Sequence, residues 1–200
     1  MFAEATGHWH DDPSSQAAPL EENWFSDREE SVFRKTLLRL HRANFELWHQ
    51  EDKARDPSAS DAQIADVKRS IDGLNQRRND LVEHFDGLLL ASLEARKLPS
   101  PKAKLHSETP GMMLDRLSIL ALKIYHTQQE TERLDAPEGH VERNRERLLL
   151  LRSQRDDSAA CLDELWADVL SGRGRFKLYR QLKMYNDPAL NPVLYSSPRK

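Results

Sequence analysis

The chain has 200 residues, 32% of them charged, and a formal net charge of −3. This length fits one domain with a full core, or one domain with tails. The single cysteine, Cys161, excludes an intrachain disulfide framework and a cysteine-based zinc cluster. No stretch approaches the roughly 18 apolar residues of a membrane span, and the start lacks a signal-peptide pattern. We therefore expect a cytoplasmic protein that makes no membrane contact.

Charge is distributed unevenly along the sequence. Residues 1–30 contain eight acidic residues and one base, whereas residues 173–200 contain seven bases and one acidic residue. Residues 1–27 also carry little apolar surface, so we expect an acidic, disordered arm that can be removed, with Trp24 and Phe25 docking at its end.

Helical periodicity dominates the rest of the chain. Turns at DPSAS and DAPEGH and the proline-rich stretch KLPSPKAKLHSETPG separate helices at about residues 27–55, 61–96, 112–134 and 141–171. Ser60 and Gln63 predict a capping box, and Gly172 predicts a helix end. The expected fold is all-α: an antiparallel bundle of four long helices with a short C-terminal helix and an ordered tail.

Three parts follow from this organisation: the arm at 1–27, a helical bundle at 28–172 and a basic C-terminal segment at 173–200 that docks on the bundle. The third helix is apolar nearly all round and should be central. Cys161 adjoins Leu162 and Leu165 in the helical pattern, so we expect it to be a buried packing residue.

Polar residues continue the apolar face of the first helix. On a helical wheel, Asn44, Trp48, Glu51 and Arg55 fall within about 60° of Phe33. His49 and Asp52 lie on a flank of this stripe, whereas Glu46 points away from it. The second helix repeats the pattern, with core-facing positions occupied by Lys68, Asp72, Asn75, Arg78 and Asn79.

A short turn makes the two helices antiparallel neighbours, so their polar stripes should face each other at one end of the bundle. Unpaired buried charges are costly, so these residues must pair or bind a ligand. One interpretation is a structural network, with Glu51 paired to Lys68. The other is a pocket in which Arg55, Lys68, Arg78 and Arg180 hold an anion and His49, Glu51 or Asp52 handles protons or a metal. The predicted catalytic residues are His49, Glu51 and Asp52, and the predicted ligand-binding residues are Asn44, Trp48, Arg55, Lys68, Asp72, Asn75, Arg78, Asn79, Arg180 and Lys183.

Established catalytic motifs give little guidance. The Glu-x-x-His spacing of Glu46 and His49 occurs in di-iron bundles, but Glu46 points outward and no second copy exists. Glu83 and Asp86, with Glu51 and Asp52, resemble the carboxylate sets of helical pyrophosphatases that bind Mg²⁺, which is a weak pattern. Phosphate-binding glycine loops and nucleophile elbows are absent. The sequence therefore leaves the cofactor and metal unknown.

Basic and aromatic residues alternate near the C-terminus, a composition that suits phosphates or nucleic acid. The alternative is a solvated segment whose aromatic residues dock on the bundle. We favour docking and do not expect nucleic-acid binding.

Four stretches resemble a bacterial family known only as domain-of-unknown-function family 4254: LHRANFELWHQEDKAR, KRSIDGLNQRRNDLVEHFD, DRLSILALKIYH and YRQLKMYNDPALNP. The resemblance spans about residues 37–195 and implies an all-helical protein without an established activity. It also implies a gene setting beside sugar transferases of envelope polysaccharides.

These observations predict a helical protein with a polar pocket that binds a phosphorylated or nucleotide-sugar-like small molecule in envelope polysaccharide metabolism. The alternative is a non-catalytic scaffold or partner-binding module whose polar stripe is a structural network. The oligomeric state does not follow from the sequence.

Overall fold

A computed structural model describes residues 1–11, 28–183, 187 and 189–196. Its helices and strands are α1 (Phe2–Asp11), α2 (Arg28–Lys53), α3 (Asp61–Glu94), β1 (Lys104–Leu105), α4 (Pro110–Glu132), α5 (His140–Leu170), β2 (Gly174–Arg175) and α6 (Pro192–Tyr195). The all-α class is confirmed, and the predicted long helices correspond to α2–α5, with ends within two residues of those expected.

Local signals set the helix ends. The Ser60 hydroxyl accepts from Gln63 N, and the Gln63 side chain accepts from Ser60 N at 2.8 Å, so the predicted capping box is present. Gly172 follows α5 with φ of 75°, a left-handed conformation that glycine adopts without a steric cost. These positions confirm the helix boundaries that the sequence predicted.

The start of α4 is fastened to α3 through a buried carboxylate. Asp86 accepts a hydrogen bond from the hydroxyl of Thr109, the N-cap residue of α4, and another from Gly111 N at 2.7 Å. Amides at a helix N-terminus favour a negative charge, but burial raises the pKa of Asp86 to about 6. A β-carbon on Gly111 would lie 2.8 Å from Asp86 Oδ1 and 2.9 Å from Val82 O, so the close approach requires glycine.

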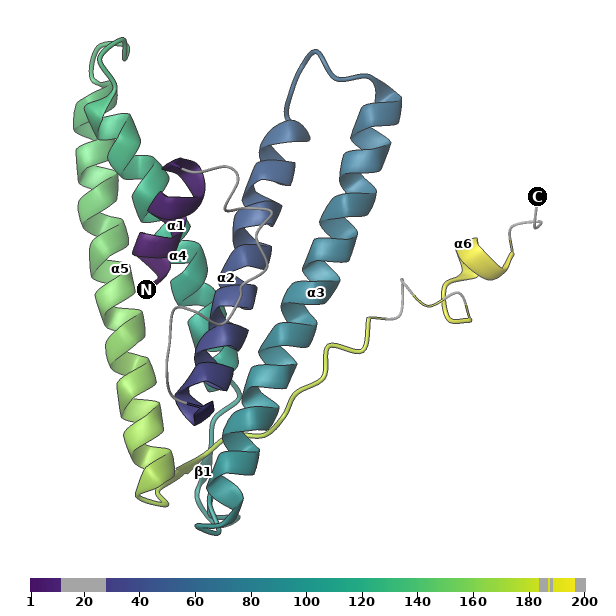
Figure 1. The fold of residues 1–200 in the computed structure, drawn as a ribbon, viewed down its shortest axis with the longest axis vertical. Helices are drawn as coiled ribbons and strands as arrows, with labels where there is room; N and C mark the ends of the chain where they lie inside the picture. Colours follow the sequence, from purple (N-terminus) through teal and green to yellow (C-terminus); the bar gives the residue numbers. More distant parts are fainter. Residues whose placement is uncertain (12–27, 184–186, 188, 197–200) are drawn as a thin grey trace.

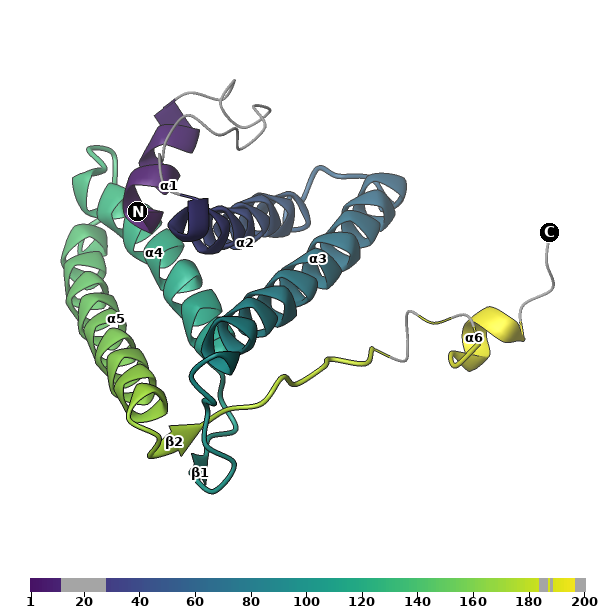
Figure 2. The same cartoon turned by 60° about the horizontal axis from the view of Figure 1, so that its bottom comes forward.

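Two helical hairpins meet along α4. The α2–α3 pair and the α4–α5 pair are each in extensive contact, and α4 also contacts α1, α2 and α3 (Figure 1). Among the described residues, the backbone of α5 approaches only α4 and β2. In Figure 2, α3 and α5 lie on opposite sides of α2 and α4. α4 is therefore central, as predicted, but the arrangement does not confirm a four-helix bundle.

Apolar side chains form two separate clusters. The first cluster joins α3, α4 and α5 with the residue that follows β2. It contains Leu93 of α3, Met113 of α4, Leu165 and Val169 of α5, and Phe176. The parallel pairing of β1 with β2 lies next to this cluster and contributes a bond from Lys104 N to Arg173 O at 3.0 Å. The second cluster joins Trp9, Phe45 and Leu122 from α1, α2 and α4.

The expectation of a disordered arm is wrong for residues 2–11, which form α1. Phe2, Ala5, Thr6 and Trp9 recur at helical spacing, and Thr6 and Trp9 are buried against α2 and α4. Polar residues lie between these positions, so the overall composition of residues 2–11 did not predict this short apolar face. Residues 12–27, including Trp24 and Phe25, lie outside the described residues.

Cys161 is exposed, which corrects its predicted burial. The helix α5 packs on α4 along one side only, and that side carries Leu165 rather than Cys161. Beyond Phe176 the chain crosses α3, where Gln181 N donates to Glu83 Oε1 at 2.8 Å, and it then leaves the helices (Figures 1 and 2). Leu182 is exposed. The division into arm, bundle and docking segment stays a prediction.

Candidate functional site

The charged residues at the outer end of the predicted stripe pair with residues four positions away in the sequence. Arg55 Nη1 donates to Glu51 Oε2 at 2.9 Å, and Lys68 donates to Asp72. The side chains of Glu51 and Arg55 are 42% and 69% exposed. The expected buried pair between Glu51 and Lys68 therefore does not form.

The physical reason is the absence of a third helix at this level. No described residue of α2 after Phe45 is buried, and none of α3 before Ile71 is buried. The ends of α2 and α3 that the turn between them joins diverge from α4 and α5 (Figure 1), and on this projection the inward faces have no core to enter. Glu51, Arg55, Lys68 and Asp72 lie on this projection.

The remaining predicted residues are spread along the hairpin. Asn75 and Asn79 are half-buried on α3, and Asp52 Oδ2 lies 3.9 Å from His49 Nδ1 on α2. Lys68 and Arg78 are separated by about 15 Å of helical rise, since each residue adds about 1.5 Å. Arg180 lies 3.8 Å from Glu83 Oε2, and Lys183 is half-buried nearby in the chain. The four predicted anion-binding cations are thus not brought to one point.

A chain of buried polar side chains instead links α1, α2 and α4. The Thr6 hydroxyl donates to Phe2 O, so it accepts from His41 Nε2–H at 2.9 Å. His41 Nδ1 then accepts from the Ser118 hydroxyl at 2.9 Å. This pattern assigns the tautomer of a neutral imidazole, and burial lowers the pKa of His41 to about 4.

The same chain continues from Ser118 to the predicted residues Asn44 and Arg78. Asn44 Nδ2 donates to Ser118 Oγ at 3.0 Å and to Asp115 Oδ1 at 2.8 Å. Arg78 Nε lies 3.8 Å from Asp115 Oδ2. A serine beside a histidine suggests nucleophilic catalysis, but His41 and Ser118 are both 0% exposed. No substrate reaches them, so their role is to join the helices.

Sequence reasoning missed His41 and Ser118 as partners. On the helical wheel His41 falls about 80° from Phe33, just outside the stripe. Asn44, by contrast, was identified as a polar residue in a core position, and it is buried.

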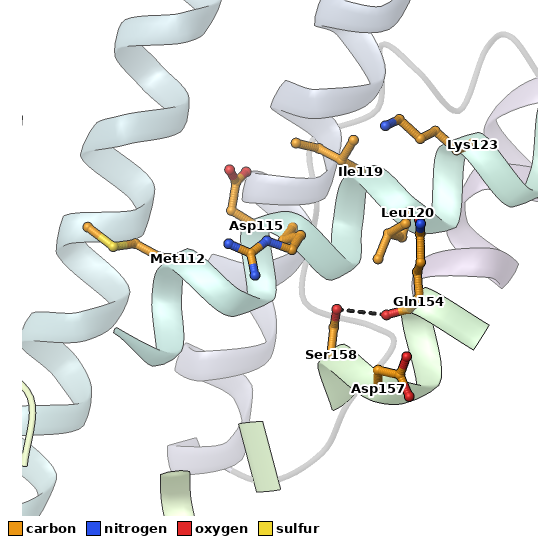
Figure 3. A pocket seen from close by; sticks show the side chains of 9 residues that line it. Met112, Asp115, Ile119, Leu120, Lys123, Gln154, Asp157 and Ser158 are labelled. Carbon is orange, nitrogen blue, oxygen red and sulfur yellow. Dashed lines mark hydrogen bonds between the residues drawn. The ribbon is translucent and has the colours of Figure 1, made fainter. Parts of the chain in front are cut away.

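An open groove runs between α4 and α5. Its first half, of about 590 Å³, is lined by Asp115, Arg116, Ile119 and Lys123 of α4 and by Gln154 and Asp157 of α5 (Figure 3). Its second half, of about 520 Å³, is lined by Lys123, His126, Asn144, Arg147 and Leu151, together with Trp48 of α2. Lys123 lines both halves, so the two halves adjoin at this residue.

Charged side chains of both signs, with Glu130 among the acidic ones, and a flat aromatic surface line this groove. Arg147 donates to Asn144 Oδ1 at 3.0 Å, and Lys123 is exposed and has no ion pair within the described part of the chain. The rings of Trp48 and His126 stack with centroids 4.6 Å apart and an interplanar angle of 8°. Positive charge beside an aromatic plane suits a phosphorylated molecule that carries a ring.

Metal binding has no support from side-chain positions. Among residues 1–11, 28–183, 187 and 189–196, no group of three or more histidine, cysteine or acidic side chains is arranged to hold a metal ion. The predicted metal-handling residues Glu51 and Asp52 lie near the end of α2, whereas Glu83 lies farther along α3 than Arg77, whose guanidinium contacts Glu46.

These features define an all-α protein of two hairpins with a polar groove along the central helix. The model of a family described as protein of unknown function (DUF4254) matches residues 34–178, and the chain belongs to this family. No curated protein and no solved structure matches the chain. None of the helices in the described residues is long and apolar enough to cross a membrane.

Proposed function

We propose that the chain binds a small phosphorylated molecule, of the nucleotide-sugar class, in the groove between α4 and α5. The observation that carries this proposal is the position of Lys123. It lies where the two halves of the groove meet, and no described residue neutralises it. A phosphate there would provide the missing counter-charge.

The rest of the groove favours a ligand with a ring. Arg147 lies on the opposite wall, and Trp48 with His126 offers an aromatic surface. Asp115 and Asp157 in the first half are acceptors for sugar hydroxyls. The gene setting that the family resemblance implies, beside sugar transferases of envelope polysaccharides, agrees with this ligand class. Catalysis by His49, Glu51 or Asp52 stays an untested prediction.

The proposal is tested by thermal denaturation with a panel of inorganic phosphate, nucleotides and sugar nucleotides. A ligand at one hundred times its Kd adds about 2.7 kcal/mol to the free energy of unfolding. For a chain of this size that corresponds to a rise in Tm of roughly 5–10 °C. We expect Lys123→Met to abolish the rise and Lys68→Met, a cation outside the groove, to retain it.

Two results would contradict the proposal. One is a panel without any rise in Tm, and the other is a rise that survives in Lys123→Met. A rise lost only in Lys68→Met would place the ligand at the projecting end of α2 and α3, as the sequence first suggested.

A partner-binding scaffold is the second candidate function. It is favoured by Leu149 and Leu150 of α5, which are 67% and 59% exposed on a helix whose backbone approaches only α4 among the described helices. Contiguous exposed apolar residues mark surfaces that bind other proteins. This function would be supported if no ligand of the panel raised the Tm and if Leu149→Ser and Leu150→Ser weakened self-association of the protein.

A further inference from the structure

Three histidines, one each from α1, α2 and α4, meet at the interface between these helices. The ring centroid of His10 on α1 lies 5.3 Å from that of His49 on α2 and 5.0 Å from that of His126 on α4. The rings of His49 and His126 are 6.1 Å apart. This histidine cluster spans the interface where α1 lies against α2 and α4 (Figures 1 and 2).

The cluster is built for neutral imidazoles. His10 Nδ1–H donates to Thr6 O at 2.8 Å, which leaves its Nε2 to face the interface. The Nε2 atoms of His10 and His126 are both buried, and neither has a hydrogen-bond partner in the described residues. Tyr125 stacks on His10, with ring centroids 4.6 Å apart, and Trp48 stacks on His126. A proton added at the buried Nε2 of His126 would have no hydrogen-bond acceptor among the described residues.

Charged neighbours come from every helix around the cluster. Acidic groups are Asp11 on α1, Asp52 on α2, 3.9 Å from His49, and Glu130 on α4, which already bonds His140 of α5 at 2.7 Å. The cationic groups Arg42 and Lys53 belong to α2. Burial, followed by the facing histidines, lowers the pKa of His126 to about 4. Burial, followed by His10, also lowers the pKa of His49, so the nearby carboxylates do not compensate.

The helix α1 depends on this interface for its structure. It has 10 residues, fewer than the roughly 12–15 below which an isolated helix is marginal in water. Its other attachments include Trp9 in the apolar cluster, the bond between Thr6 and His41, and the stacking of Phe2 on His41.

We infer that His10, His49 and His126 form a proton-sensitive latch that holds α1 against α2 and α4 when neutral and releases it when protonated. The docked state binds fewer protons than the released state, because burial in the docked state lowers the pKa values of His49 and His126 below the ordinary value of about 6.5. Docking is therefore fully favourable above that pH and weakens as the pH falls toward the folded values.

Amide hydrogen exchange of residues 2–11 in the full chain tests the latch between about pH 7.5 and pH 5, after correction for intrinsic exchange rates. We expect the protection of α1 to be constant above about pH 6.5 and to fall about tenfold for each further pH unit and each proton taken up below it. The amides of α4 should keep their protection over this range.

Variants separate the latch from general acid unfolding. Replacing His10, His49 and His126 together with Phe should remove the pH dependence, because Phe keeps a ring but takes up no proton. The control His84→Phe alters an exposed histidine on α3 and should behave as the parent. If the triple variant fails to fold, His126→Gln alone should shift the release of α1 to lower pH.

Three outcomes would overturn the inference: constant protection of α1, loss of α1 only together with α2–α5, or unchanged pH dependence in a folded triple variant. The last result would direct attention to His41, whose Nε2 bonds Thr6 of α1.

Discussion

His41 and Glu51 lie ten residues apart on α2, and they differ in the helices that lie beside them. His41 is covered by α1 and α4, so each of its ring nitrogens has a defined partner. Glu51 lies where α2 has only α3 beside it, and it pairs with Arg55 one turn away. Coverage by a third helix, rather than charge, therefore decides which polar side chains interact across the interface.

This difference makes the charged pair on α2 nearly dispensable. We expect Glu51→Gln to lower the free energy of unfolding by no more than about 0.5 kcal/mol, because exposed pairs one turn apart contribute little. Denaturant unfolding of the parent and variant measures this change. A loss of roughly 3–5 kcal/mol would instead indicate a buried, orphaned partner.

Among the helices, the junction between α3 and α4 is the most sterically restricted. Thr109 caps α4 while donating to Asp86, and Gly111 allows the two helices to approach. The sequence placed Asp86 on the inward face of α3, but it suggested a metal ligand. The sequence did not predict Thr109 as the partner of Asp86, because Thr109 lies in a loop 23 residues along the chain and a helical wheel describes one helix at a time.

The glycines of these two helices should respond oppositely to alanine. Gly111→Ala should lower the free energy of unfolding by about 1–3 kcal/mol, since Val82 O and Asp86 leave no space for the methyl group. Gly73→Ala on α3, where nothing lies within 4 Å, should raise it by about 0.5–1 kcal/mol. Thermal and denaturant unfolding of both variants supply the comparison. Equal effects would mean that the contact at Gly111 is not restrictive.

For the whole molecule, the sequence predicted helix type and helix ends well. Periodicity and capping residues such as Ser60 act within a few residues, so they can be recognised without tertiary information. Wheels also showed the direction of Asn44 correctly. They could not show how far along α2 and α3 another helix would cover that direction, so the buried pairing of Glu51 and the convergence of the cations were predicted wrongly. The groove depends on α5 lying beside α4 alone, a packing choice that no local pattern encodes.

One-sided packing of α5 predicts uneven stability across the helices. Amides in the middle of α5, near residues 149–157, should exchange faster than those of α4 near residues 115–127, because local opening exposes less apolar surface there. Hydrogen exchange followed by mass spectrometry resolves the two helices. Equal protection that falls on dilution would reveal a second copy covering Leu149 and Leu150.

The pairing of β1 with β2 has a consequence for how this structure could be divided. Bonds from Lys104 N to Arg173 O and from His106 N to Arg175 O join the strand preceding α4 to the strand following α5. The α4–α5 hairpin thus leaves and re-enters the chain at a single point. Adjacent entry and exit points are the geometry that permits a segment to be inserted into, or excised from, another backbone. The hairpin that carries most of the groove could therefore be inserted as one continuous segment into a loop of another protein.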